Sequence, residues 1–374
     1  MNFSCLQENL QKGLQFVSHI TGREQSLPIL SSILFKTQDG LLTLYATNLE
    51  IGASCSIRGK IEKEGSIALP SKIFTEYISL LPKEKIDIEL HDNNILHVKC
   101  QNYSTKIKGL DPNEFPLIPQ LESPQQFEFQ TEELKKAFQC TLFTVSPQET
   151  KQELSGLLCL FNHEQNTVVC VGTDAYRLAE YTLSPSQEIP LTESVIIPLR
   201  TAQEVLRMMQ QDTSGKIRME WNEHQIAFYC DSYQLISKRI QGTYPDYTQI
   251  IPQSFATKIV LDVDECSKAV KTTSLFSKSS LSDIHIQCLS TNRDQGRLLF
   301  SSSNAATGES VVQLEVEMQG SENAITLNYK YFLDGLQTLE STKGLLSIID
   351  NTNPCILKPI EKPGYQYLIM PIRQ

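Results

Sequence analysis

Hydrophobic and polar positions along the chain form phrases that recur at an interval close to the length of a whole domain. The first phrase is an apolar run that ends in a small polar turn, at residues 42–50, 168–176 and 298–306. Its turn triplets begin at Thr47, Thr173 and Ser303, which are 126 and 130 positions apart. A second phrase joins an apolar strand to an amphipathic helix, at residues 66–81, 194–209 and 324–339. Periods of about 20–50 residues indicate solenoids, whereas this longer period predicts one domain used three times.

The joints between the repeats are rich in proline and glutamine. The phrase NEFPLIPQ closes the first repeat at residues 113–120, and PDYTQIIPQ closes the second at residues 245–253. Such stretches favour turns and linkers over regular structure. We therefore expect domains at residues 1–122, 127–253 and 254–374.

Within each repeat the pattern predicts a helix, several strands, a second helix and further strands. The first helices are expected at residues 5–20, 131–145 and 262–276, with Thr131 and Asp262 as N-caps. The second helices are expected to begin at Ser71, Arg200 and Tyr329. Alternation with period two predicts hairpins at residues 85–100 and 216–230. The fold class is therefore α+β, with three repeated domains that each pack two helices on antiparallel sheet.

Composition adds limits to this picture. The first residues lack the pattern of a signal peptide, and no apolar run approaches the ~20 residues that a membrane-spanning helix needs. We expect a cytoplasmic protein with no membrane contact. The ten cysteines are scattered without a C-x-x-C pair, which indicates buried, reduced thiols rather than a metal site.

The net charge of −10 argues at first against nucleic acid. A local basic surface can nevertheless coexist with an acidic exterior. Lys72, Arg200 and Lys330 occupy near-equivalent places at the starts of the three second helices. A helix N-terminus disfavours cations, so the repetition suggests contact with phosphate. The alternative is a solvated helix face, where acidic neighbours such as Glu76 balance the charge.

Motifs for catalysis are missing from the sequence. It contains no G-x-G-x-x-G, G-x-x-x-x-G-K-[ST], G-x-S-x-G or H-E-x-x-H. The six histidines are separated, although His91 and His97 flank a predicted hairpin turn and could meet across it. Asp174 and Arg177 could form an acid and an anion clamp, but no nucleophile or base stands beside them. We expect no cofactor, and a turn-stabilising role for Asp174.

Four segments in order resemble one known family. They are LPIL at residues 27–30, TDAYRLA at 173–179, YPDY at 244–247 and YLIMPIRQ at 367–374. Together they are similar to the bacterial sliding clamps, the β subunits of DNA polymerase III, and the similarity runs from end to end. The resemblance implies a ring-shaped head-to-tail homodimer around double-stranded DNA, which it holds independently of base sequence and without catalysis. It also implies partners, namely the polymerase catalytic subunit, the clamp loader and repair factors, which dock short peptides of glutamine followed by bulky apolar residues.

The resemblance also assigns three sets of residues. The DNA-facing residues would be Arg23, Lys72, Lys136, Arg200, Lys268 and Lys330. The walls of the partner-peptide pocket would be Leu154, Thr173, Ala175, Tyr176, Arg177, Leu178, Pro245, Gln249, Ile250, Leu368, Ile369, Met370, Pro371, Ile372 and Arg373. The dimer interface would include Ile107, Leu275 and Phe276.

The sequence departs from the family pattern at three places. Gln249 stands where a basic residue is common, Ala175 and Tyr176 replace a frequent glycine-histidine pair, and residues 358–365 form a longer, more charged segment. Two alternatives to a clamp remain from the residues alone. One is an adaptor that binds proteins only, and the other is a hydrolase or transferase built around Asp174 and nearby histidines.

Overall fold

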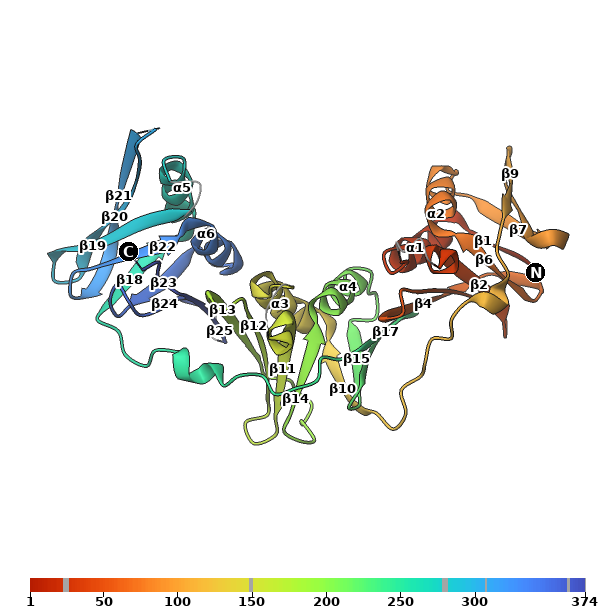
Figure 1. The fold of residues 1–374 in the computed structure, drawn as a ribbon, viewed down its shortest axis with the longest axis horizontal. Coiled ribbons are helices and arrows are strands. Elements are labelled where there is room, and N and C mark those ends of the chain that lie inside the picture. The colour runs from red at the N-terminus through yellow and green to blue at the C-terminus, as the bar shows by residue number, and fades with distance from the viewer. Residues whose placement is uncertain (23–26, 148–150, 278–281, 307, 362–363, 374) are drawn as a thin grey trace. The chain divides into compact units, whose positions relative to one another are not determined.

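The computed structural model describes residues 1–22, 27–147, 151–277, 282–306, 308–361 and 364–373. The chain forms two compact units, one of residues 1–133 with 200–239 and the other of residues 134–199 with 240–374. Figure 1 shows the course of the chain through its elements. The central third of the sequence therefore contributes to both units, and the three domain boundaries expected from sequence stay a prediction.

The helices recur in pairs along the chain, as the repeat predicts. They are α1 (Gln7–Ser18), α2 (Ser71–Leu80), α3 (Thr131–Thr141), α4 (Leu199–Met209), α5 (Val263–Ser274) and α6 (Tyr329–Thr338). The expected starts at Ser71 and Tyr329 are confirmed, and α4 begins one residue before Arg200. Of the two expected N-caps, Asp262 is confirmed, because its carboxylate accepts the Glu265 N–H at 2.9 Å, whereas Thr131 is the first residue of α3 itself. α1 and α2 lie side by side in the first unit, as do α5 and α6 in the second (Figure 1).

The expectation of a helix over residues 5–20 was wrong at its beginning. Cys5 and Leu6 belong to a strand, β1, and pair with Ile86 and Lys85 of β7. This pairing spans some eighty positions, so periodicity within the segment could not reveal it.

The first unit contains two antiparallel sheets within the described residues. The smaller has the order β5 (Lys60–Lys63), β1 (Asn2–Leu6), β7 (Lys85–His91), β8 (Ile95–Cys100) and β9 (Tyr103–Lys108). The larger has the order β10 (Gln125–Gln130), β15 (Lys216–Trp221), β16 (Gln225–Cys230), β17 (Tyr233–Lys238), β4 (Ile51–Arg58), β3 (Leu41–Thr47), β2 (Ser32–Gln38) and β6 (Gly65–Pro70). Both predicted hairpins are confirmed, as β7–β8 and β15–β16.

The second unit is built on one long antiparallel sheet. Its order is β14 (Glu193–Pro198), β11 (Gly156–Asn162), β12 (Thr167–Thr173), β13 (Arg177–Leu183), β25 (Tyr365–Ile369), β24 (Cys355–Pro359), β23 (Lys343–Ile348), β18 (Thr257–Asp262), β21 (Gly308–Gly320), β20 (Gln295–Asn304), β19 (Asp283–Asn292) and β22 (Asn323–Asn328). The strands expected to end at Thr47 and Thr173 do so. The third was expected to turn at Ser303, but β20 continues to Asn304, which pairs with Gly308.

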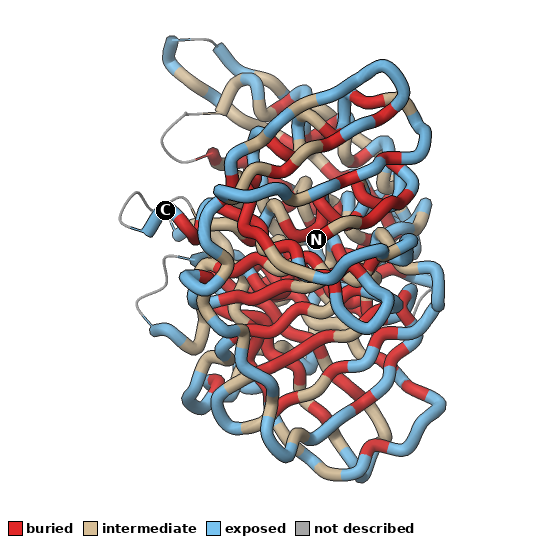
Figure 2. Tube along the Cα trace, turned by 90° about the vertical axis from the view of Figure 1, so that its right-hand side faces the viewer, coloured by how far each residue is buried: buried red, intermediate tan, exposed pale blue. Residues whose placement is uncertain are grey.

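Alternating side chains of the strands fill the cores beneath the helices. Buried positions follow the strands, and exposed positions gather at the loops (Figure 2). All ten cysteines are buried free thiols, which confirms the sequence expectation. Burial raises the pKa of several of them, for example that of Cys288 to about 12, because a thiolate is disfavoured in an apolar core.

Candidate peptide groove, DNA-facing helices and sheet edges

An apolar cluster in the second unit brings together part of the expected pocket wall. Leu178 and Leu368 lie in its buried centre, and Leu154 and Met370 pack against them. The two leucines face each other directly across the β13–β25 pair. Residues nearly 200 positions apart therefore form one apolar surface.

The C-terminal segment continues the sheet beyond β25 and borders this cluster. Arg177 pairs with Ile369, and the Met370 N–H then donates to the Tyr176 carbonyl at 2.8 Å. Two residues later the Ile372 N–H donates to Thr326 at 2.8 Å. Pro371 and Ile372 are half-buried and Arg373 is exposed. Main-chain bonds on both sides thus hold this segment as one wall of the apolar surface.

Beside this segment, and bonded to it through the Tyr176 carbonyl, lies a tight turn between β12 and β13. The Thr173 hydroxyl donates to the Arg177 carbonyl at 2.7 Å and accepts the Ala175 N–H at 3.2 Å. The Asp174 carboxylate accepts the N–H groups of Tyr176 and Arg177 at 3.1 and 3.0 Å. Ala175 adopts φ 68°, and the Tyr176 side chain is 64% exposed at the turn. The expected turn-stabilising role of Asp174 is therefore visible in its bonds.

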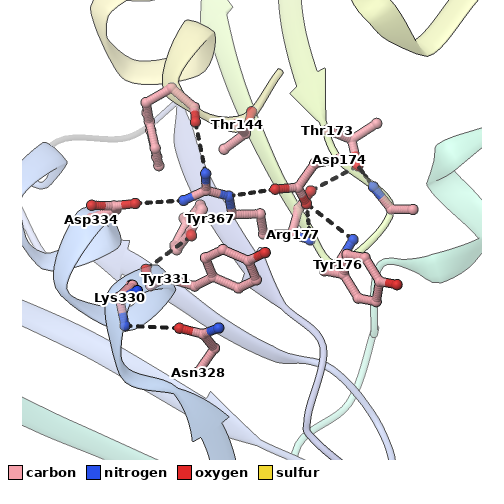
Figure 3. Close-up of polar contacts among 12 residues, drawn as sticks. Thr144, Thr173, Asp174, Tyr176, Arg177, Asn328, Lys330, Tyr331, Asp334 and Tyr367 are labelled. Carbon is pink, nitrogen blue, oxygen red and sulfur yellow. Dashed lines mark hydrogen bonds and ion pairs between the residues drawn. The ribbon is translucent and has the colours of Figure 1, made fainter. Parts of the chain in front are cut away.

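Arg177 points away from solvent into a network of charged and aromatic groups (Figure 3). Its Nε donates to Asp174 at 2.8 Å, one terminal nitrogen to Asp334 of α6 at 2.6 Å, and the other to the carbonyl of Phe143 at 2.9 Å. Phe143 belongs to the short helix η4 (Leu142–Thr144). The guanidinium carbon lies 4.3 Å from the centroid of the Tyr331 ring.

This network favours the charged form of Arg177. Burial disfavours the cation, but Tyr367, Asp334 and Asp174 together raise the pKa of Arg177 above its ordinary value. The Arg177 side chain is 13% exposed. The side chain that the sequence suggested as a donor for a ligand is thus already committed to groups of the protein.

The remaining expected wall residues lie at the rim. Pro245, Gln249 and Ile250 are exposed, and the Gln249 amide donates to Asp246 at 2.9 Å. Tyr244 precedes them and lies in the buried centre of the cluster, where burial raises the pKa of its hydroxyl. The sequence did not single out Tyr244 as a wall residue, although it stands inside the YPDY motif.

Five of the six expected DNA-facing residues lie on helices, and they differ in exposure. Exposed side chains belong to Lys72 of α2, Arg200 of α4, Lys268 of α5 and Lys330 of α6. Lys136 of α3 is half-buried and its Nζ lies 3.1 Å from the Glu340 carboxylate. Arg23 lies outside the described residues.

Of the expected interface residues, one lies on a strand at the end of a sheet and two follow a helix. Ile107 is on β9, the last strand of the five-stranded sheet. Leu275, 74% exposed, and Phe276 follow α5, and Phe276 approaches Gly308 at the start of β21.

Comparison with known proteins then decides the family. Models of the DNA polymerase III beta subunit match the chain from end to end, as the N-terminal domain over residues 1–119, the central domain over 128–246 and the C-terminal domain over 248–373. The chain belongs to this family of sliding clamps.

Relatives of the clamp cover its whole length. It is 25% identical over 373 residues to the beta sliding clamp of Chlamydia trachomatis, covering 100% of this chain and 87% of the relative. Its structure is similar to that of DNA polymerase III subunit beta from Pseudomonas aeruginosa, with TM-score 0.92, 25% identity and full coverage of both chains. It is also similar to the clamp from Bartonella birtlesii bound to griselimycin, with TM-score 0.91, 25% identity and full coverage of both chains.

Membership of the clamp family settles the class of function. Sliding clamps are non-catalytic processivity factors of the polymerase holoenzyme, so the hydrolase or transferase built around Asp174 and the protein-only adaptor are both set aside. His91 and His97 do meet across their hairpin, with ring centroids 4.0 Å apart. Within the described ranges, no three metal-ligating side chains converge, and no helix combines the length and hydropathy that a membrane crossing needs.

Proposed function

We propose that two copies of this clamp close head to tail around double-stranded DNA and hold it without reading its bases. The observation that carries the proposal is a repeated cation. Lys72, Arg200 and Lys330 are each the second residue of α2, α4 and α6, and all three are exposed. Because the positive end of a helix dipole disfavours a cation, its recurrence in all three repeats favours a shared ligand, and phosphate is the chemical match.

Ring closure uses two sheet edges of opposite charge. The outer edge of β9 carries Lys106 and Lys108 beside Ile107. The second edge is on β21. Strand β18 pairs with β21 from Glu317 onward, and before Glu317 the described neighbour of β21 is β20, on its other side.

The second edge complements the first. The part of β21 that β18 does not cover carries Glu309 and Glu315. It also carries the exposed Val311, and the exposed Leu275 directly follows α5. Pairing β9 of one copy with β21 of the other would match lysine to glutamate and cover both free edges. Closure in this way makes the homodimer a ring.

The apolar surface around Leu178 and Leu368 would receive partner peptides. Its walls are the turn at Thr173 and the segment at Met370, and its lining is apolar and includes the flexible methionine. A glutamine followed by bulky apolar residues suits such a surface. The partners would be the polymerase catalytic subunit, the clamp loader and repair factors. The clamp would act in the cytoplasm, and its three domains would span residues 1–122, 127–253 and 254–374.

The decisive experiment combines particle mass with retention on DNA. Small-angle scattering at several concentrations is expected to give about twice the 42.2 kDa chain mass. Lys72→Glu, Arg200→Glu and Lys330→Glu combined should abolish retention on nicked circular DNA after loading by a clamp loader.

A matched triple variant controls for the change in net charge. Lys36→Glu, Lys99→Glu and Lys258→Glu reverse three exposed lysines on strands and should leave retention intact. Equal retention by both triples would overturn the DNA-facing assignment. A monomer at every concentration would overturn ring closure.

A further inference from the structure

The first repeat contains a second copy of the turn that walls the groove. The Thr47 hydroxyl donates to the Ile51 carbonyl at 3.0 Å and accepts the Leu49 N–H at 3.0 Å. The Asn48 side-chain oxygen accepts the N–H groups of Glu50 and Ile51 at 3.0 and 2.8 Å. Leu49 adopts φ 73°. Bond for bond, this is the framework described for the turn at Thr173.

The neighbouring strand is attached to both turns in the same way. The Lys238 N–H donates to the Glu50 carbonyl at 3.3 Å, just as the Met370 N–H donates to the Tyr176 carbonyl at 2.8 Å. In each case a strand of the following repeat pairs beside the turn. The first turn therefore serves as an internal reference for the second.

The two turns differ at the position of Arg177. Ile51 occupies the equivalent place in the first turn, so the turn and its strand attachment form without an arginine. What Arg177 adds are its bonds to Asp334 and to the Phe143 carbonyl, and its stacking on Tyr331. These contacts connect the turn to α6 and to η4, not to itself.

The helix side of this connection is also specific to the third repeat. The sixth residue of each second helix is acidic, namely Glu76 of α2, Glu204 of α4 and Asp334 of α6. Glu76 is exposed, and the Glu204 carboxylate accepts a hydrogen bond from Arg207 of its own helix at 2.9 Å, while the first turn has Ile51 in place of a cation. The pair Arg177–Asp334 is thus an addition to a framework that is complete without it.

We propose that Arg177 is a positioning residue, which ties the turn at Thr173 to α6 and so fixes the groove wall against the Met370 segment. This inference rests on the proposed peptide groove. Arg177 acts through the turn, because each of its three side-chain nitrogens already donates to a group of the protein. Asp334 lies on α6, the helix that carries Lys330, and not in the turn. It nevertheless becomes a determinant of peptide affinity, because it accepts the hydrogen bond from Arg177.

Peptide binding to the full chain tests the proposal. The probe is a fluorescein-labelled peptide of glutamine followed by leucine and phenylalanine, titrated by fluorescence anisotropy. Asp334→Asn should weaken binding about three- to tenfold, and Glu76→Gln, the matched change on α2, should leave the Kd unchanged. Arg177→Lys, which keeps the charge but cannot bond Asp174, Asp334 and Phe143 together, should weaken binding at least as much. Equal Kd values for Asp334→Asn and Glu76→Gln would overturn the proposal.

Hydrogen exchange of the Met370 amide gives a readout that needs no peptide. Its exchange should be faster in Asp334→Asn, while the Lys238 amide beside the first turn should exchange as in the parent protein. Unchanged Met370 exchange would contradict the inference even if the peptide bound weakly for another reason. Failure of the parent protein to bind the peptide would instead reject the groove, while faster Met370 exchange would still support the tie.

Discussion

The side-chain amide of Gln249 donates to the carboxylate of Asp246, with 2.9 Å between Nε2 and Oδ2. The Thr248 hydroxyl and N–H donate to the same carboxylate at 2.6 and 3.2 Å. These bonds, those of Thr248 first, lower the pKa of Asp246. The rim of the groove therefore presents a carboxylate beside Gln249, the position at which the sequence departs from the family pattern.

The first prediction concerns peptide charge. Gln249→Arg should improve the affinity for a peptide with an acidic residue after its glutamine by about two- to fourfold, because an exposed ion pair contributes little. It should leave an uncharged peptide unaffected. Anisotropy titrations of both peptides measure the difference. Gln253→Arg adds the same charge at another exposed site of the linker and should not discriminate between the peptides; equal gains from both variants would contradict the rim assignment.

A second prediction concerns the charges of the sheet edges. Lys106→Glu with Lys108→Glu should weaken the dimer, because like charges would then face each other across the joint. Adding Glu309→Lys and Glu315→Lys in the same chain should restore it. Light scattering over a range of concentrations and salt follows the mass.

The opposite edge of the same sheet supplies the control for this experiment. Lys60→Glu with Lys63→Glu alters β5, which lies at the other end of the order, and should leave the dimer intact. Failure of the four-fold variant to recover would show that these lysines and glutamates do not face one another.

Gly335 makes room for Tyr367 in the core beneath α6. A Cβ at this position of α6 would collide with the ring of Tyr367, whose hydroxyl donates to Tyr331 at 2.9 Å. Gly335→Ala should therefore destabilise the second unit by about 1–3 kcal/mol. The cost of this collision exceeds the roughly 1 kcal/mol by which alanine stabilises a helix relative to glycine. Urea unfolding measures the change, and Ser79→Ala on exposed α2 surface is the control. A stabilised Gly335→Ala protein would mean that Tyr367 can move at little cost.

Asp350 gives a pH-dependent contribution to stability. Hydrogen bonds from Thr352 first, and from Asn353, lower its pKa to about 2 from 3.8. Because the folded state binds the proton less readily than the unfolded state, this contribution is present above about pH 4 and is lost as the pH falls toward 2. Asp350→Ala should therefore lower the urea midpoint at pH 7 and lower it less at pH 3. A difference that stays constant with pH would contradict the assignment.

Local pattern was sufficient for the elements whose signals are local. The N-cap at Asp262 and the tip of the hairpin after His91 depend on residues a few positions apart, and both were predictable. The strand at Cys5 was not, because its partner Ile86 lies far along the chain. The turn expected at Ser303 became strand because its partner β21 extends to meet it, and nothing in the tripeptide indicates that length.

The features of the site also divide into those that the sequence indicates and those that depend on distant residues. Recurrence placed Thr173 in a turn and the resemblance placed Leu368 in the pocket, and Leu368 lies in the apolar cluster opposite Leu178, which follows that turn. Arg177 and the Asp334 to which it donates are 157 positions apart in the sequence. From the sequence alone, an arginine in a turn motif could equally be a hydrogen-bond donor to a ligand. Its commitment to the protein becomes visible once α6 is folded against the turn.

The burial of all ten cysteines leaves the clamp surface without a reactive native thiol among them. Leu117, 96% exposed, could then be replaced by cysteine and coupled to a maleimide dye without removing any native cysteine. One fluorophore on each copy would report opening and closing of the assembly in real time. Because the native thiols are buried, this single substitution would prepare the protein for single-molecule observation.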